Sequence, residues 1–411
     1  MAISIDLSLS NSTPSISSAT DVYVNSSLDP ASPPCTDWSP VPITTVIPTI
    51  FSIICLVGTL ANALAVFVLA CGSNSRRTVA DIFMLNLCVS DLLFLLSLPL
   101  WAVYYSQSYN WPFGRVACKI CGALLNLNLY ASIFFITSMS MDRYFAIVHP
   151  LRSLSARNPK LACLVCILVW FLACACTAPT FALRDTVHHK ELDAEVCGIL
   201  YPDDTWFLVL VWMKILLGFL LPLFAISCCY CAIGRHLLAY RDLMTTHHPP
   251  NVSSQEGHRK PAPTPSVITS SSEDKPPTGG RIERVLLTVA AVVLAFFICW
   301  FPFHCVTFLD ILKSKGWLGS CSVTWTIKNL TPLTLCLGFS NSAINPVLYC
   351  FIGNHFQHRL EDLFKGLCAC LKAHREEHRQ KRGSFSTRLS SFSRKLSDLK
   401  DLAIVETSNR P

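Results

Sequence analysis

Seven long apolar runs constrain the fold of this chain more than any other feature of its sequence. A helix needs about 20 predominantly apolar residues to cross the hydrocarbon core of a bilayer. In lipid, the backbone polar groups must be satisfied within the spanning element, which favours helices for runs of this length. We therefore expect an all-α membrane protein, a seven-transmembrane helix bundle. The runs occupy residues 43–71, 79–105, 115–149, 160–182, 205–239, 284–312 and 323–351.

Composition supports a membrane environment and argues against a soluble enzyme. Of the 411 residues, 52% are hydrophobic and 14% are charged, whereas an average soluble domain has about 25% charged residues. The mean hydropathy is +0.44. The net charge of +7 is too small and too dispersed to indicate a nucleic-acid partner. Membrane lipid is the expected surrounding.

The positions of the basic residues predict which way the helices face. Most Lys and Arg outside the apolar runs lie in 72–78, 150–159, 240–283 and the stretch after residue 352. By the positive-inside rule these segments are cytoplasmic, which places the N-terminus outside the plasma membrane and the C-terminus inside. Sequons at Asn11 and Asn25 are candidate glycosylation sites on the outer side, although a further sequon at Asn251 falls in a predicted cytoplasmic loop.

The chain is expected to divide into an outer segment, a helical domain with one long cytoplasmic loop, a surface helix and a disordered tail. Apolar residues at helical spacing predict that the surface helix is amphipathic and lies on the inner leaflet. Cys368 and Cys370 near its end are candidates for palmitoylation. The parts are 1–42, 43–352 with the loop 240–283, 353–370 and 371–411.

Four of the 21 cysteines fall on the predicted outer face, where the environment is oxidising. Four cysteines allow three pairings. Their disposition favours Cys118 with Cys197, which ties an outer loop to the third span, and Cys35 with Cys321, which ties the N-terminal segment to the seventh. The alternative is that these outer thiols are free.

Asp91 lies in the middle of the second apolar run, where an ionised side chain is costly and is retained for a functional or paired role. One carboxylate with neutral oxygens suits a sodium ion better than a divalent or transition metal. The alternative is a protonated aspartic acid in a hydrogen-bonded network without an ion. No other cofactor is expected. The residues that offer oxygens to Asp91 are Asn62, Asn128, Ser132, Asn341, Ser342 and Asn345.

Several short motifs occur near the ends of the runs, each a weak signal alone. Asp142-Arg143-Tyr144 ends the third run, and the simplest interpretation is an anchoring pair that reaches the headgroups. Pro302, in Cys-Trp-Phe-Pro, removes a backbone hydrogen bond and is expected to kink the sixth helix. Pro346, in Asn-Pro-Val-Leu-Tyr, places a second kink in the seventh.

Together and in order, these motifs resemble the rhodopsin-like family of G-protein-coupled receptors. The resemblance implies an outer ligand pocket and an inner face that opens to a heterotrimeric G protein when the sixth span swings at Pro302. It implies that Arg143 pairs with Asp142 at rest and that Trp300 senses the ligand. The matching residues are Asn62, Asp91, Cys118, Asp142, Arg143, Tyr144, Trp170, Pro222, Tyr230, Phe296, Trp300, Pro302, Asn345, Pro346, Tyr349 and Phe356. Those that the family assigns to activation and coupling are Asp142, Arg143, Tyr144, Tyr230, Phe296, Pro302, Pro346 and Tyr349.

Longer stretches are similar to the angiotensin II receptors within that family, above all to the type 2 members. They include 126–144, 213–219, 291–310 and 337–357. This similarity implies that Lys214 binds the C-terminal carboxylate of an angiotensin-like peptide hormone. Arg184 would hold the peptide from above, and Asp310 would face its arginine. The full set of implied ligand-binding residues is Trp101, Tyr104, Tyr105, Arg184, Lys214, Trp300, His304 and Asp310.

Each ligand-binding residue has a structural alternative. Lys214 lies inside an apolar run, where a buried ammonium needs an anion, unless its chain reaches the outer surface. Trp101 and its tyrosine neighbours fit an interfacial aromatic belt equally well. Arg184 fits a loop salt bridge with Asp185 or with another acidic residue of the outer loops. Lys328 stands where angiotensin receptors carry an acidic residue, which leaves the identity of the peptide open.

Other classes of function remain as alternatives. A receptor for a bradykinin, apelin or chemokine-type peptide would use the same machinery with a different pocket. An ion channel or transporter would use Asp91 for conduction, but internal repeats are absent from the sequence. A membrane enzyme is not expected, because the spans lack paired carboxylates and a Ser/His/Asp set. Hydroxyls at 384–398 are candidate sites for receptor kinases whose added charge recruits arrestin, unless the tail is unmodified.

Overall fold

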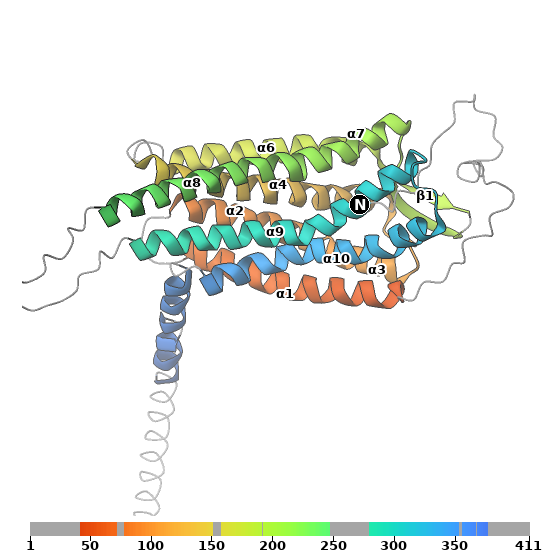
Figure 1. The fold of residues 1–411 in the computed structure, drawn as a ribbon. Helices are drawn as coiled ribbons and strands as arrows, with labels where there is room; N and C mark the ends of the chain where they lie inside the picture. The colour runs from red at the N-terminus through yellow and green to blue at the C-terminus, as the bar shows by residue number, and fades with distance from the viewer. Residues whose placement is uncertain are drawn as a thin grey trace, which may run out of the picture. The chain divides into compact units, whose positions relative to one another are not determined.

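Long helices form the bundle seen in a computed structural model of the protein (Figure 1). The first six helical segments are α1 (Ile43–Cys71), α2 (Val79–Leu95), α3 (Leu98–Ser106), α4 (Gly114–Val148), α6 (Pro159–Leu183) and α7 (Asp204–Ile215). The chain continues through η1 (Leu216–Leu220), α8 (Leu221–Thr246), α9 (Gly279–Ser314) and α10 (Cys321–Ile352). The structure describes residues 42–71, 78–150, 158–190, 192–246, 279–352, 356–366 and 368–376.

Six helical spans in the described residues are long and apolar enough to cross a membrane. They correspond to the first six runs expected from the sequence. The seventh run forms α10, whose 32 residues carry polar Asn341, Ser342 and Asn345 along its length. The expected all-α membrane architecture is therefore confirmed, and Figure 1 shows the long helices lying side by side.

Two spans are interrupted where the sequence places proline. The second span divides at Leu96 and Ser97, and Pro99 occupies the first turn of the following helix α3. Ser97 Oγ donates to the carbonyl of Phe94 at 2.7 Å, which satisfies one acceptor at the break. The fifth span contains the π-helical turn η1 shortly before Pro222, a wide turn often found near functional sites.

The predicted cytoplasmic loop 240–283 is shorter in the structure. Helix α8 continues to Thr246 and α9 begins at Gly279, so both ends of that range are helical. Polar residues in these extensions do not stop a helix that has already begun in an apolar run. Residues 247–278 lie outside the described part of the chain.

A two-stranded antiparallel sheet follows α6 and was not expected from the sequence. Strand β1 (Arg184–His189) pairs with β2 (Ala194–Ile199), with Thr186 opposite Cys197. The backbone N–H of Trp111 donates to the carbonyl of Glu195 at 2.6 Å, which ties the loop before α4 to this hairpin. We call the end of the bundle that carries it the hairpin end (Figure 1).

The segment after the bundle forms a separate compact unit. Residues 356–366 and 368–376 are helical, so helix extends beyond the expected limit of residue 370. Cys368 and Cys370 are exposed free thiols. The remaining tail, with its candidate phosphorylation sites, lies outside the described residues, as do Asn11, Asn25 and the N-terminal segment.

Candidate functional site

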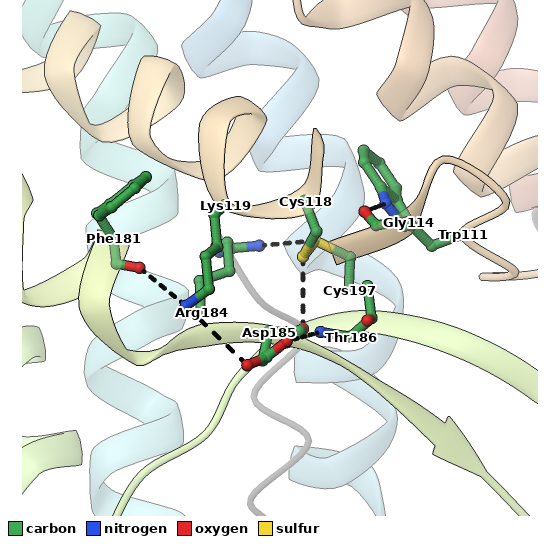
Figure 2. The surroundings of a disulfide bond; sticks show 9 residues. All are labelled: Trp111, Gly114, Cys118, Lys119, Phe181, Arg184, Asp185, Thr186 and Cys197. Atoms are coloured by element: carbon green, nitrogen blue, oxygen red, sulfur yellow. Dashed lines mark hydrogen bonds and ion pairs between the residues drawn. A yellow bond between two sulfur atoms is a disulfide. The ribbon is translucent and has the colours of Figure 1, made fainter. Parts of the chain in front are cut away.

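A disulfide joins α4 to the hairpin, as predicted. Cys118 and Cys197 are 79 positions apart in sequence and their Cα atoms are 5.6 Å apart (Figure 2). Cys321 is also disulfide-bonded. Its predicted partner Cys35 lies outside the described residues, so that pairing stays a prediction. The first bond fixes β2 against α4, and β1 is held there through its pairing with β2.

Arg184, the first residue of β1, is directed into the bundle and has no exposed surface. Its guanidinium carbon lies 5.6 Å from the Trp101 ring centroid, and Nη1 lies 3.6 Å from Cys197 Sγ. Burial lowers the pKa of Arg184 to about 10, so the side chain remains a cation at neutral pH. Nε and Nη2 have no hydrogen-bond partner within the described chain.

The expected alternative for Arg184, a salt bridge with its neighbour Asp185, is wrong. The Asp185 carboxylate instead contacts Arg115 Nη2 at 2.7 Å and Lys119 Nζ at 4.0 Å. Successive side chains in a strand point to opposite faces, which separates the two neighbours. Asp185 therefore does not neutralise the charge of Arg184.

Two further basic groups lie near Arg184. Lys214 on α7 is half-buried and close enough to Arg184 for the two cations to repel each other. His304 on α9 is buried beside Lys214, and neither of its ring nitrogens has a hydrogen-bond partner in the described residues. No carboxylate in the described ranges forms an ion pair with Arg184 or Lys214. Arg184 and Lys214 form a cationic cluster suited to a ligand carboxylate, and the buried His304 ring lies beside it.

Aromatic side chains line the same end of the bundle. Trp101, Tyr104 and Tyr105 are 3%, 4% and 6% exposed, so the alternative of a belt facing the headgroups is wrong. Trp101 contacts Tyr104 at 5.8 Å between ring centroids, in an edge-on arrangement that aromatic pairs favour. Trp101 also contacts Trp111, with centroids 5.2 Å apart. These rings form a compact wall next to Arg184.

Deeper in the bundle, Trp300 on α9 is buried among aromatic rings. Its centroid lies 6.2 Å from Phe296 and 5.9 Å from Phe303. Gly338 on α10 approaches so closely that a Cβ there would stand 3.0 Å from the Trp300 ring. The predicted position of Trp300 below the ligand residues is compatible with a sensing role, since any shift of α9 must move this ring.

Asp310 is not brought into contact with the cationic cluster in the described chain. It is half-buried on α9 and interacts with Lys313, one turn further along the same helix. Lys328, the residue that departs from the angiotensin receptor pattern, is exposed on α10. The assignment of Asp310 to the arginine of a peptide stays a prediction.

The polar network around Asp91 forms as expected at the middle of the bundle. Asn128 Nδ2 donates to Asp91 Oδ1 at 2.9 Å, and Asn345 Nδ2 donates to Oδ2 at 3.0 Å. Ser342 Oγ donates to Asn128 Oδ1 at 3.3 Å, and Ser132 accepts from Asn128 at 3.3 Å. All five side chains are buried, and they link α2, α4 and α10.

Three oxygen atoms in buried asparagines near or within this network accept no hydrogen bond from the described chain. They are the Oδ1 atoms of Asn62, Asn341 and Asn345. Asn62 Nδ2 donates to the Ser342 carbonyl at 2.8 Å, which brings α1 into the network. A carboxylate with unsatisfied neutral oxygens fits a hard monovalent cation such as sodium. Within the described residues, no group of three or more His, Cys, Asp or Glu is placed to hold a metal ion.

At the opposite end of α4, Arg143 forms an ion pair with Asp142. Arg143 is only 8% exposed, so the interpretation of a pair reaching the headgroups is wrong. Tyr230 on α8 lies close to Arg143 and Ser140. Tyr144 Oη and His149 Nε2 are 3.1 Å apart.

The remaining residues predicted for activation lie on α9 and α10. Phe296 is fully buried beside Trp300, and Pro302 and Pro346 lie inside α9 and α10. Tyr349 belongs to α10, but its side chain lies outside the described part.

Sequence reasoning missed the residues that surround Arg184. Gly122 on α4 and the outer contacts of Asp185 were not singled out, and neither was Tyr201, which interacts with Arg184. One signal was present, because Gly122 follows Cys118 by four positions and so lies one turn along the same helix face.

Known proteins similar to this chain were found by comparison of sequences. A family model described as 7 transmembrane receptor (rhodopsin family) matches residues 61–349. The chain is 38% identical over 349 residues to the type-2 angiotensin II receptor of Homo sapiens, covering 84% of this chain and 87% of that receptor. It is 40% identical over 333 residues to the type-2 receptor of Ovis aries, covering 80% and 83%. It is 34% identical over 354 residues to the type-1 angiotensin II receptor of Canis lupus familiaris, covering 86% and 87%.

Proposed function

The chain belongs to the rhodopsin family of seven-transmembrane receptors, and we propose that it is a plasma-membrane receptor for an angiotensin-like peptide hormone that signals to a heterotrimeric G protein. The family is a class of receptors rather than enzymes. The similarity to receptors named for angiotensin II supports the choice of peptide.

The observation that carries the proposal is the cationic cluster at the hairpin end. Arg184 has no exposed surface, its Nε and Nη2 lack partners in the described chain, and Lys214 lies close enough to repel it. Two cations held together without a carboxylate are costly unless a ligand supplies one. The C-terminal carboxylate of a peptide provides that charge, and the neighbouring Trp101 and Tyr104 offer contact surface for its apolar side chains.

Ligand binding acts through a shift between two arrangements of the bundle. A peptide that binds the cationic cluster contacts β1, α7 and α9 better in one arrangement of the helices. Because Trp300 and Pro302 belong to α9, a movement of this helix extends from the ligand site to the opposite end of the bundle. Arg143 leaves Asp142 and contacts the G protein. Tyr230 and Tyr349 stabilise that active state.

A sodium ion at Asp91 favours the inactive arrangement. The carboxylate and the unsatisfied oxygens of Asn341 and Asn345 would hold it, and its positive charge would offset the cost of burying Asp91. A ligand that prefers one arrangement and an ion that prefers the other necessarily oppose each other.

The orientation expected from the basic loops completes the proposal. The N-terminus, with glycans at Asn11 and Asn25, lies outside together with the hairpin end, and the C-terminus lies in the cytoplasm. Cys368 and Cys370, exposed on their helix, carry palmitoyl groups that hold it at the inner leaflet. Receptor kinases modify the tail, and arrestin binds the modified receptor.

The first test measures saturation binding of labelled angiotensin II to intact cells that express the chain. We expect specific binding that Lys214→Ala weakens roughly 10- to 100-fold, because hydrogen bonds to charged groups contribute about 1.5–3 kcal/mol. Lys315→Ala, which removes an exposed lysine just beyond α9, is the matched control and should bind as the unmodified receptor does.

If Lys214→Ala binds angiotensin II with unchanged affinity at equal surface expression, the assignment of an angiotensin-like ligand is wrong. Displacement of the label by bradykinin but not by unlabelled angiotensin II would favour the second candidate, a receptor for another peptide. The exposed Lys328 on α10 supports that candidate, because angiotensin receptors carry an acidic residue at this position.

A further inference from the structure

We propose that Gly122 and Asp185 position the guanidinium of Arg184 and thereby set the preference of the receptor for peptides with a free C-terminal carboxylate. The inference rests on the proposed function. It assigns a positioning role to Gly122, which lies against the Arg184 side chain, and to Asp185, the next residue in β1; neither contacts the ligand. Gly122 acts from inside the bundle, and Asp185 acts from outside it.

Gly122 provides the space in which the Arg184 side chain lies. A Cβ at position 122 would stand 2.1 Å from Arg184 Nε, 2.2 Å from Cδ and 2.8 Å from Cζ. Nonbonded heavy atoms normally approach to about 3.5–4.0 Å, so the side chain would have to move by more than about 1 Å. The colliding atoms include the middle of the side chain, which cannot swing aside as a free end does.

Trp101 and Cys197 also confine the Arg184 side chain, although Nη2 has no hydrogen-bond partner in the described residues. The Trp101 ring lies 5.6 Å from Cζ, the Cys197 sulfur lies 3.6 Å from Nη1, and no part of the residue reaches solvent. Any added atom at Gly122 therefore displaces the guanidinium rather than a mobile neighbour. Since alanine forms helix better than glycine, helix stability gives no reason for glycine at this position of α4.

Asp185 holds the backbone next to Arg184 from the outer side. One carboxylate oxygen contacts Arg115 Nη2 at 2.7 Å. The same oxygen lies 4.0 Å from Lys119 Nζ, and the other accepts from the backbone N–H of Thr186 at 2.9 Å (Figure 2). Arg115 and Lys119 lie on α4, about two turns and one turn before Gly122. Helix α4 therefore binds the Asp185 carboxylate through its basic side chains and leaves space for the Arg184 side chain at Gly122.

Lys119 extends this attachment to α6. Its Nζ donates to the Phe181 carbonyl at 3.5 Å (Figure 2). It also donates to the Ala182 carbonyl at 3.2 Å and lies 5.9 Å from the centroid of the Phe181 ring. These groups belong to the last turn of α6, where unsatisfied carbonyls favour a cation. The backbone is thus held before Arg184, at the end of α6, and after it, at Asp185. Because successive side chains in a strand point to opposite faces, holding Asp185 outward directs the guanidinium of Arg184 inward.

A guanidinium held in one direction distinguishes a carboxylate from an amide. A carboxylate can accept two parallel, charge-assisted hydrogen bonds from the planar fork, whereas a primary amide offers one neutral oxygen. Preorganisation strengthens this difference, because the side chain does not lose freedom on binding. The displaced guanidinium in a Gly122→Ala receptor would lose the discrimination along with affinity.

The test compares binding of angiotensin II and of the same peptide with a C-terminal amide on intact cells. We expect the unmodified receptor to prefer the free acid roughly ten-fold or more, on the scale of one charge-assisted interaction. Gly122→Ala should reduce this ratio to near one, and Asp185→Asn, which keeps the shape but removes the charge, should reduce it several-fold. Gly198→Ala is the matched control, because a Cβ at this hairpin glycine meets no atom within 4 Å and should leave the ratio unchanged.

A double variant keeps the test decisive if Gly122→Ala reaches the cell surface poorly. With Arg184 shortened to alanine, the space beside residue 122 is vacant, so adding Gly122→Ala to Arg184→Ala should change neither surface expression nor affinity. If Gly122→Ala is as harmful in that background as in the unmodified receptor, its effect does not act through Arg184 and the inference fails.

Failure of this inference and failure of the proposed function give different results. If the unmodified receptor does not bind angiotensin II, or binds acid and amide equally, the proposed ligand contact is wrong. If the unmodified receptor discriminates between the two peptides and Gly122→Ala discriminates equally well at normal expression, the ligand contact stands and the positioning role of Gly122 is refuted.

Discussion

At the residue scale, Asp91 joins three helices through a single carboxyl group. Its two oxygens accept hydrogen bonds from Asn128 on α4 and Asn345 on α10, while its own backbone belongs to α2. A change in the relative position of these helices must break or lengthen one of the two bonds. The hydrogen bonds of Asp91 therefore depend on the arrangement of the bundle.

Asp91→Asn should abolish the dependence of agonist binding on sodium. In the unmodified receptor, replacing a large organic cation by sodium at constant ionic strength should lower agonist affinity if, as proposed, sodium stabilises the inactive arrangement. The amide of the variant lacks the charge that holds the ion. Competition binding of angiotensin II at several sodium concentrations measures the effect, and an equal sodium response in the variant would exclude the ion site.

Single residues differ in how far sequence alone identifies their roles. Asp91 and Lys214 are conspicuous because an ionisable group within an apolar run has few explanations. Arg184 could be named only through the resemblance, since its burial depends on a strand that the sequence did not predict. Gly122 was not found, because a glycine in a helix gives no local sign of the side chain that passes beside it.

At the element scale, the close approach of α9 and α10 depends on Gly338. A Cβ at this position would lie 3.0 Å from two carbon atoms of the Trp300 ring, within a region where neighbouring Phe339 is also buried. The two helices can contact here because one of them presents no side chain. This contact lies between the cationic cluster and the end of the bundle that carries Arg143.

Gly338→Ala should lower the thermal stability of the purified receptor. Overpacking a buried contact costs typically about 1–3 kcal/mol, which exceeds the gain in helix propensity. The apparent Tm in detergent should fall by several degrees. Gly234→Ala, at a helical glycine of α8 with no atom within 4 Å of the added Cβ, should leave it unchanged or slightly higher. Equal Tm values for both variants would contradict the packing argument.

The sequence predicted long helices well and irregular elements poorly. The limits of α1 coincide with the apolar run 43–71, because hydropathy over 20 residues is a strong local signal. The hairpin depends on pairing between β1 and β2 and on the disulfide to α4, which no local pattern reveals. The π-helical turn at Leu216–Leu220 likewise reflects the packing of the fifth span rather than its composition.

At the scale of the whole molecule, the direction of insertion rests on the distribution of charge. The hairpin end carries the Cys118–Cys197 disulfide, which forms in an oxidising compartment. The basic segments expected inside connect the opposite helix ends. Both arguments support the proposed orientation, in which the cationic cluster lies toward the outside of the cell.

Glycosidase treatment tests this orientation. Receptor from mammalian cells should lose mass when treated with peptide N-glycosidase, and the double variant Asn11→Gln/Asn25→Gln should not. Asn251→Gln removes the sequon of the predicted cytoplasmic loop and is the control, so it should behave as the unmodified receptor does. A glycan that maps to Asn251 would reverse the predicted topology.

The disulfide between α4 and β2 also determines the order in which the receptor can be made. Cys118 is synthesised 79 residues before Cys197, so the third span must be inserted and wait for the hairpin before the bond can close. His304 is synthesised later still, as part of α9. The cationic cluster is therefore completed late in biosynthesis, so the proposed binding of a peptide would also report that the receptor has matured.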